Sequence, residues 1–289
     1  MIYLLLSILS STCILLIFKF IAIRNIPALP VIVINYSVCI LCGFIALNNT
    51  FFVSAILQKN WFPLACLLGA LFIVGFYLMA LSVQYAGVTV TSVANKLSLI
   101  IPVIAALYLY GDTLNSFKIL GILFGIIAIF LLRHKEEISQ KSGISMYIIL
   151  PKVVLISSGM VDTIANYAQK IAVPQNEYTL FLIVVFGMAA IIGWIVLIVN
   201  ILKRKHALNY KIILGGIALG IPNYGSMYFL IMGLSYSGLQ SSVFFPLNNL
   251  TVVIFSFIAA VIIFKEQYSK RNIMGLAIAI TSIILMAIA

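Results

Sequence analysis

The chain has 289 residues, of which 64% are apolar and only 8% are charged. Soluble domains carry about 25% charged residues, so the composition excludes a water-soluble globular protein and indicates an integral membrane protein. The net charge of +11 reflects 17 Lys and Arg against 6 Asp and Glu. Because most of the basic residues lie in short connections between apolar runs, this excess indicates contact with the lipid bilayer and not with nucleic acid.

Ten apolar runs are long enough to cross the membrane, since a hydrocarbon core of ~30 Å requires roughly 20 helical residues. The predicted spans are residues 2–23, 28–47, 61–83, 88–109, 115–132, 146–171, 178–202, 210–234, 239–264 and 270–288. Turn residues such as Gly87, Gly111 and Gly238, or clusters of charge, separate them. The predicted fold is an all-α integral membrane protein with ten transmembrane helices.

An internal repeat relates the two halves of the chain. The segment FYLMALSVQYAGVTVTSV resembles YFLIMGLSYSGLQSSV, with Gly87 aligned to Gly238. The segment FKILGILFGIIAIFLL resembles RNIMGLAIAITSIILM, with Gly121 aligned to Gly275. A five-span unit is therefore predicted to have been duplicated, with residues 1–143 and 144–289 as its two copies. Five is odd, so the copies are inverted repeats, which in many transporters provide alternating access. The alternative is that duplication only enlarged a bundle.

Small residues mark where helices approach closely. Gly121 and Gly125 form one GxxxG pair, and Gly216 and Gly220 form another. Glycine allows two helix backbones to come together in a membrane. We interpret both pairs as packing sites and not as functional sites.

Two charged residues are predicted to lie deep in the membrane. Lys96 follows the start of the fourth span by about nine residues, and Asp162 precedes the end of the sixth by about ten, which places both over ~10 Å from a surface. A charge at such a depth costs at least ~2.5 to 3.5 kcal/mol and needs a partner or water. Two interpretations stay open: a salt bridge that only holds the halves together, or a site in which Lys96 binds an anionic group and Asp162 is a counter-ion or proton carrier.

Polar side chains accompany these charges on three of the predicted spans. Around Lys96 they follow helical spacing, and the ninth span carries a matching stripe at the repeat-related position. Together with polar residues of the eighth span, they are predicted to face one central cavity, because polar groups facing lipid would lack partners. The predicted substrate-binding residues are Ser92, Asn95, Lys96, Asn223, Tyr224, Tyr228, Ser241, Asn248 and Asn249.

Prolines lie within three spans, at Pro102, Pro222 and Pro246. A proline frees the carbonyl four residues earlier and can interrupt a helix. We therefore predict these three positions as interruptions and hinges.

Enzyme signatures are absent from the sequence. It contains no HExxH, GxSxG or Gly-rich phosphate loop, and its two histidines, His134 and His206, lie in charged connections. We predict no catalytic residue, metal or cofactor. The alternatives to transport are a membrane-embedded enzyme, for example one using Asp112 and Asp162 as an aspartyl pair, and a non-transporting scaffold or receptor.

The ten spans, the five-plus-five duplication, the lysines near the ends of the first and sixth spans and the proline-bearing fourth and ninth spans resemble the drug/metabolite transporter superfamily, in its ten-helix EamA-like branch. The resemblance covers essentially the whole chain. It implies a permease of the cell (inner) membrane with two inverted repeats around a central pocket, which commonly exports amino acids or other small metabolites, with coupled protons as a further partner. The sequence departs from the family in having Gly111–Asp112 where Gly-Glu is usual, which weakens any role for an acid there.

The charges of the connections predict the orientation. The connections after spans one, five, seven and nine hold eleven Lys and Arg, whereas the opposite set holds three, Lys59, Lys118 and Lys170. The positive-inside rule then places both termini outside. Many family members are thought to have both termini inside, but the bias of eleven basic residues against three favours both termini outside for this chain.

Overall fold

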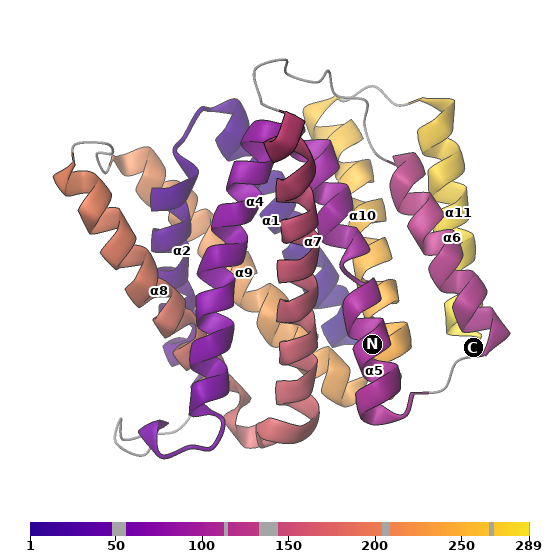
Figure 1. Cartoon of the computed structure of the whole chain (residues 1–289), viewed down its shortest axis with the longest axis horizontal. Helices are drawn as coiled ribbons and strands as arrows, with labels where there is room; N and C mark the ends of the chain where they lie inside the picture. Colours follow the sequence, from indigo (N-terminus) through magenta and orange to yellow (C-terminus); the bar gives the residue numbers. More distant parts are fainter. Residues whose placement is uncertain (48–55, 113–114, 133–143, 204–208, 266–268, 289) are drawn as a thin grey trace. The chain divides into compact units, whose positions relative to one another are not determined.

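The computed structural model describes residues 1–47, 56–112, 115–132, 144–203, 209–265 and 269–288. Within these ranges every regular element is a helix and no strand occurs. The helices are α1 (Ile2–Ile23), α2 (Ala28–Ala46), α4 (Phe62–Leu97), α5 (Ile100–Tyr110), α6 (Ser116–Leu132), α7 (Ile144–Tyr167), the π-helix η1 (Ala168–Ala172), the 3-10 turn η2 (Gln175–Glu177), α8 (Tyr178–Leu202), α9 (Tyr210–Tyr236), α10 (Ser241–Phe264) and α11 (Lys270–Ala287) (Figure 1).

Seven segments of the described part of the chain are helical, long and apolar enough to cross a membrane. The helix ends agree with most of the predicted spans to within a few residues. Gly111 and Gly238 adopt positive φ angles of 65° and 72° and lie where predicted turns end helices. The count of ten spans stays a prediction, because α5 and α6 are shorter apolar helices.

The separation predicted at Gly87 is not found. Helical hydrogen bonding runs unbroken through this glycine, from Phe62 to Leu97. A single glycine costs a helix only about 1 kcal/mol relative to alanine, so it does not force a turn. The chain is interrupted instead at Ser98 and Leu99, just before Pro102. Pro102 lies in the first turn of α5, where its missing N–H removes no helical bond.

The described chain divides into two compact units. Unit 1 contains Met1–Tyr77 and Ile164–Ser237, and unit 2 contains Leu78–Thr163 and Gly238–Ala289. Each unit combines segments of both halves of the sequence, so these units differ from the predicted copies 1–143 and 144–289. The duplication itself stays a prediction.

In unit 1, α9 packs against both α1 and α2, and α2 also packs against α8. The close approach of α9 to α2 depends on the predicted GxxxG pair. A Cβ atom added at Gly216 would lie 2.4 Å from Ile34, and one added at Gly220 would lie 2.6 Å from Val38. Real Cβ atoms do not approach this closely, so the glycines at these positions are needed for packing.

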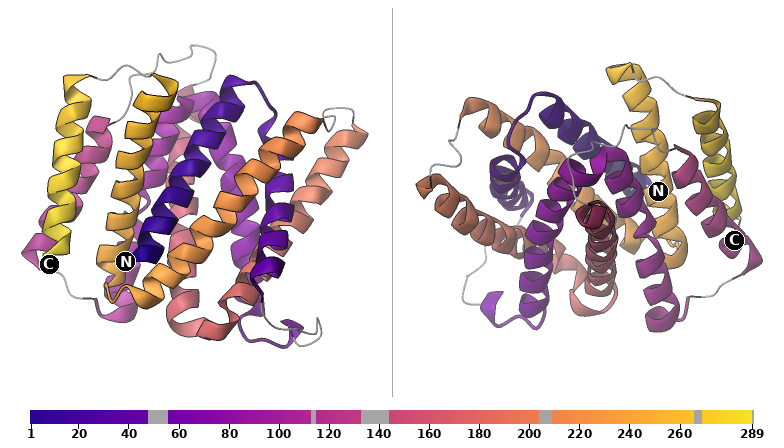
Figure 2. Two further views of the ribbon diagram at one scale, coloured as in Figure 1. Left: turned by 180° about the vertical axis from the view of Figure 1, so that it is seen from behind. Right: turned by 45° about the horizontal axis from the view of Figure 1, so that its top comes forward.

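In unit 2, α6 and α11 form an antiparallel pair that lies side by side in Figures 1 and 2. A Cβ atom added at Gly121 would lie 2.5 Å from Met286, and the Ser282 hydroxyl donates to the carbonyl oxygen of Gly121 over 2.5 Å. α10 packs against α5, α6 and α11. The predicted GxxxG pair at Gly121 and Gly125 thus also serves packing.

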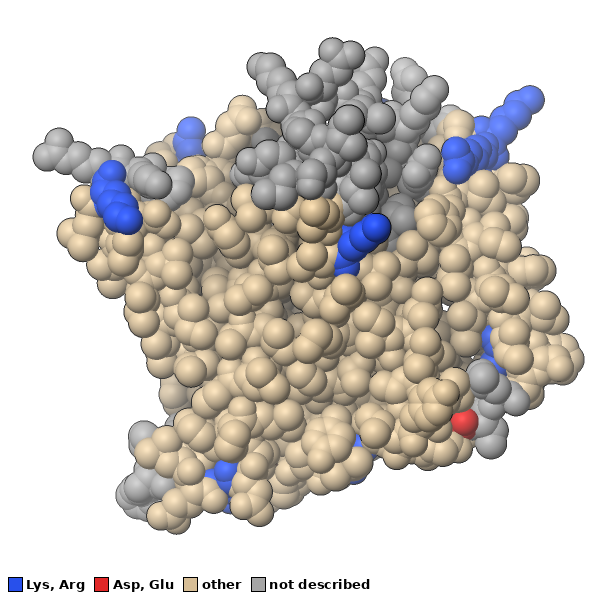
Figure 3. Space-filling view, in the orientation of Figure 1, with Lys and Arg blue, Asp and Glu red and all other residues tan. Residues whose placement is uncertain are grey.

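Large apolar side chains face outward along single helix faces. On α8, Ile191, Ile195, Ile198 and Leu202 are 50% to 78% exposed and follow the spacing of one helical face. On the side of the molecule drawn in Figure 3, Lys and Arg lie toward the helix ends, and the band between them is almost free of charge. Such an apolar surface is suited to contact with lipid and not with water.

Candidate functional site

Lys96 lies in the last turn of α4, where the negative end of the helix dipole favours a cation. Its side chain is half-buried, and its ammonium group donates a hydrogen bond to Oδ1 of Asn249 on α10, 3.2 Å away. The helix ends one residue later, and the Ser98 hydroxyl donates to the Asn95 carbonyl oxygen over 2.5 Å in the interruption before α5. Unit 2 therefore holds a half-buried lysine whose direct partner is a neutral amide.

Asp162 lies on α7, in the same unit, and interacts electrostatically with Lys96. Gly159, one turn earlier, lets α7 approach α5 closely, since a Cβ added there would lie 2.4 Å from Ile101. Lys96 and Asp162, both among the described residues, do not come within the 4.0 Å of a direct ion pair. The two charges influence each other without forming a tight salt bridge.

α10 presents its polar groups from a buried segment, since every residue from Ser241 to Leu250 is buried. Asn249 accepts the Lys96 bond. Among the described atoms, Asn248 Oδ1 and the Ser256 hydroxyl are buried without a hydrogen-bond partner. An unpaired buried polar atom costs roughly 1 to 3 kcal/mol, so these two acceptors call for a solute or a water molecule.

A second polar group lies in unit 1, between α2 and α9. Asn223 donates to Oδ1 of Asn35 over 3.0 Å, and both side chains are buried. Tyr224 stacks on Tyr228 with ring centroids 5.7 Å apart and also contacts Phe186. The sequence analysis did not identify Asn35, although an amide in the middle of an apolar span is the signal by which it could have been found.

The predicted substrate-binding residues are thus distributed over both units. Asn95, Lys96, Ser241, Asn248 and Asn249 belong to unit 2, whereas Asn223, Tyr224 and Tyr228 belong to unit 1. The side chain of Ser92 lies outside the described part of the structure. That these residues face one shared cavity stays a prediction.

The predicted interruptions by proline occur at only one of the three positions. The helix breaks just before Pro102, but α9 continues through Pro222 and α10 continues through Pro246. A proline inside a membrane helix is tolerated when neighbouring groups satisfy the freed carbonyl. Pro222 and Pro246 therefore do not end helices, and their role as hinges stays a prediction.

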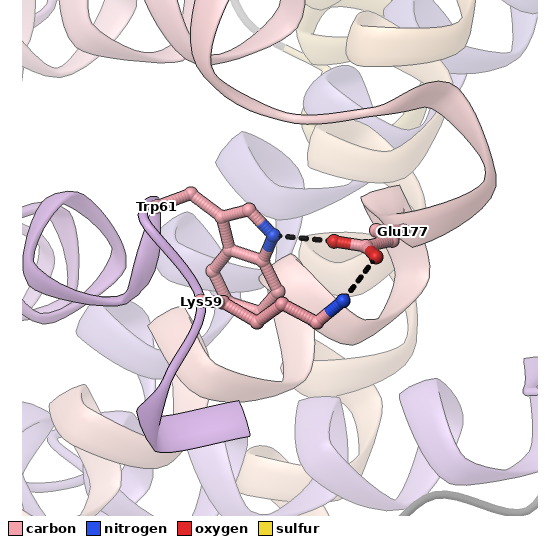
Figure 4. Close-up of polar contacts among 3 residues, drawn as sticks. All are labelled: Lys59, Trp61 and Glu177. Atoms are coloured by element: carbon pink, nitrogen blue, oxygen red, sulfur yellow. Dashed lines mark hydrogen bonds and ion pairs between the residues drawn. The ribbon is translucent and has the colours of Figure 1, made fainter. Parts of the chain in front are cut away.

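A third polar group, missed by the sequence analysis, links the chain before α4 to the start of α8 in unit 1 (Figure 4). The Glu177 carboxylate accepts one hydrogen bond from the Lys59 ammonium and another from the Trp61 indole N–H, each 2.6 Å long. Trp61 is buried and packs edge-to-face on Phe181. Lys59 and Glu177 lie 118 residues apart in sequence, so no local pattern could have paired them.

Groups of three or more His, Cys, Asp or Glu side chains that could hold a metal ion do not occur within the described ranges. The four cysteines, Cys13, Cys39, Cys42 and Cys66, are free thiols.

No family model matches this sequence. A protein of Haemophilus influenzae strain Rd, described as "Uncharacterized protein", is 28% identical over 283 residues, which cover 96% of this chain and 94% of the relative. A solved structure described as "Crystal structure of protein" is similar with a TM-score of 0.71 at 13% identity, over 98% of this chain and 96% of the other. That similarity concerns the fold alone. With the seven long apolar helices, the fold defines a helical multi-pass membrane protein.

Proposed function

We propose that this protein is a secondary transporter, an exporter of a small metabolite such as an amino acid or an organic anion, from the EamA-like branch of the drug/metabolite transporter superfamily. The observation that carries the proposal is the Lys96 ammonium, bound to the Asn249 amide inside an apolar helical unit with Asp162 in electrostatic reach. Ionisable residues inside membrane helices mark substrate or proton pathways in most proteins that contain them.

The arrangement of the two charges favours a binding site over a purely structural salt bridge. A buried ion pair offsets its desolvation only when the charged groups meet directly and in good geometry. Lys96 instead donates to a neutral amide. Asp162 has no ion-pair partner within 4.0 Å among the described residues. Lys96 therefore keeps donor capacity for a carboxylate, and Asp162 keeps acceptor capacity for a proton or a substrate ammonium group.

The unpaired oxygens of α10 supply the remaining polar contacts. Asn248 Oδ1 accepts hydrogen bonds, and the Ser256 hydroxyl both donates and accepts. A zwitterion or an organic anion carries groups of both kinds. In the proposed cycle the substrate binds between these groups, and the two inverted five-helix repeats exchange conformations around it, with the interruption before Pro102 as a place where the chain can bend.

The test of the proposal is flux in proteoliposomes. The purified protein is reconstituted, the vesicles are loaded with single radiolabelled L-amino acids or monocarboxylates, and release is compared with vesicles that contain the Lys96→Met variant. The expected result is release of at least one solute by the wild-type protein, with a strong reduction in the variant. If no solute of either class is released, the proposed function fails. If the Lys96→Met variant releases a solute as fast as the wild-type protein, the proposed site has no role in transport.

The second candidate is a non-transporting membrane scaffold in which the charges serve stability alone. Both candidates accommodate the buried Asn248 Oδ1 and the Ser256 hydroxyl, since either water or a solute can satisfy these atoms. Thermal unfolding separates the two candidates. A scaffold gains no thermal stability from any member of the same solute panel, whereas a transporter is stabilised by its substrate, and the stabilisation increases with substrate concentration.

A further inference from the structure

The turn after α5 contacts the start of α10. Gly111, in a left-handed conformation, ends α5 and places Asp112 outside the helix. Oδ2 of Asp112 accepts a hydrogen bond from the backbone N–H of Ser242, 2.9 Å away. Because the first four N–H groups of a helix have no partner within it, Asp112 satisfies a group that α10 cannot satisfy itself.

A second contact, made by the first turn of α6, holds the residue just before α10. The Lys118 ammonium, near the start of α6, donates to the side-chain oxygen of Gln240. The carbonyl oxygen of Gln240 in turn accepts the N–H groups of Val243 and Phe244, over 3.0 Å and 2.9 Å. The start of α10 is therefore held at two nearby residues, at Gln240 by the first turn of α6 and at Ser242 by Asp112 after α5.

This first turn needs external support. Pro246 has no N–H and cannot donate to the carbonyl oxygen of Ser242, so one bond of the normal helical ladder is missing. Asn249 follows Ser242 by seven residues, two helical turns, and lies on the same face about 10 Å further along the axis. A shift of the first turn along or about the axis is carried to Asn249, and hence to its bond with Lys96.

We propose that Asp112 is a positioning residue for the Lys96–Asn249 site: by holding the Ser242 N–H it fixes the register of α10 against α5 and so sets the place of Asn249 relative to Lys96. The proposal rests on the proposed transport function for its effect on substrate. The effect of Asp112 on the position of α10 does not depend on whether the protein transports a solute. It gives a role to an acid whose position the sequence analysis treated as a connection.

The experiment uses Asp112→Ala, with Asp112→Asn as a conservative variant that keeps an acceptor oxygen for the Ser242 N–H. Asn209→Ala is the matched control, because Oδ1 of Asn209 accepts a hydrogen bond from a backbone N–H in the first turn of α9, that of Ile212, 3.0 Å away. Amide hydrogen exchange is measured on the reconstituted protein for peptides from residues 241–250 and, for comparison, from 270–287. Asp112→Ala is expected to speed exchange in the first peptide and not in the second, whereas Asp112→Asn and Asn209→Ala leave the first peptide nearly unchanged.

A flux measurement then tests action through Asn249, using the solute that the wild-type protein releases fastest in the vesicle panel. Asp112→Ala is expected to raise the half-saturating concentration about tenfold, with Asp112→Asn close to wild type, and to add no further effect in an Asn249→Ala background. Unchanged exchange in residues 241–250, or an additive effect in the double variant, would overturn the proposal. If the wild-type protein releases no solute, the transport function fails, and the exchange result alone decides whether Asp112 positions α10.

Discussion

The Lys96 ammonium and the Asn249 amide, 153 residues apart in sequence, are joined by a hydrogen bond of 3.2 Å between the end of α4 and the buried stripe of α10. An amide oxygen is a weaker partner for an ammonium group than a carboxylate, so this contact leaves the desolvation of Lys96 only partly offset. Under the proposed function, Lys96 exchanges this amide for the carboxylate of a substrate.

Lys96→Met is expected to weaken binding of an anionic substrate by about ten- to a hundredfold, the usual effect of losing a hydrogen bond to a charged group. Methionine keeps the length of the side chain and removes the buried charge. The variant is therefore expected to fold and insert normally. Binding is measured by substrate-dependent thermal stabilisation.

The control for this prediction is Lys152→Met. Lys152 is exposed on α7, ten residues before Asp162. The Lys152→Met substitution removes one positive charge from the same unit, as Lys96→Met does. Equal losses of affinity in the two variants would show that the net charge matters and the site does not.

Gly220→Ala is expected to destabilise unit 1 by about 1 to 3 kcal/mol, the usual range for overpacking a tight contact. The added Cβ would lie 2.6 Å from Val38 and 2.8 Å from the backbone oxygen of Asn35, which cannot move aside cheaply. Gly187→Ala on α8 is the matched control, since a Cβ at this position meets nothing within 4 Å. Alanine is the better helix former, so the control is expected to be neutral or stabilising by up to about 1 kcal/mol. Thermal unfolding in detergent gives both values, and similar losses in the two variants would contradict the close packing at Gly220.

Helix ends and close packing could be predicted from the sequence because their signals are local. Gly111, Gly238 and the GxxxG pair at Gly216 and Gly220 act through backbone conformation or the absence of a side chain. Gly87 shows the limit of such signals, because the same residue type is tolerated in a continuous helix when nothing else favours a turn.

The contacts between distant residues could not be predicted in this way. The sequence identified Lys96, Asp162 and Asn249 as unusual within apolar spans and suggested that Lys96 and Asp162 could pair, but it did not predict the hydrogen bond from Lys96 to Asn249. Which side chain becomes the hydrogen-bond partner of Lys96 depends on differences of about an ångström or two in the distances between helices. Lys59 and Glu177 carry no local signal of their pairing, since charges in connections between spans are ordinary.

Trp61→Phe is expected to lower stability more than Lys59→Met does. Phenylalanine keeps the edge-to-face contact with Phe181 but removes a buried N–H donor, a loss of about 1 kcal/mol or more. The Lys59 side chain is 37% exposed, and exposed ion pairs contribute about 0 to 1 kcal/mol. Thermal unfolding at low and high salt tests the order, and the effect of Lys59→Met is expected to shrink at high salt. A larger loss from Lys59→Met at both salt concentrations would contradict it.

The membrane orientation follows from the bias of basic residues among the connections. In a background with the four native cysteines replaced by alanine, His206→Cys is expected to resist a membrane-impermeant thiol reagent in intact cells, whereas Ala289→Cys is expected to react. Both positions become reactive after permeabilisation, which controls for accessibility. The opposite pattern would place both termini inside, as in many members of the family that the sequence resembles.

Asp162→Asn is expected to leave the protein folded and inserted but to reduce flux and flatten its dependence on pH. The amide keeps the shape of the carboxylate and cannot ionise, so it cannot carry a proton or balance Lys96 as the pH changes. Flux is measured in proteoliposomes between pH 5 and 8, with protein content and thermal stability checked for each variant.

The double variant Lys96→Met with Asp162→Asn separates a mechanistic role of the two charges from a structural one. If the charges serve stability alone, each single change leaves the other charge buried without its counter-ion and lowers the unfolding temperature, and the double change restores it. If they bind substrate or carry a proton, the double variant is stable and does not transport, because the ammonium that binds the anion and the carboxylate that exchanges the proton are both gone. Wild-type flux in the double variant would show that neither charge takes part in transport. The buried amides of α10 would then be the polar groups available to bind a substrate.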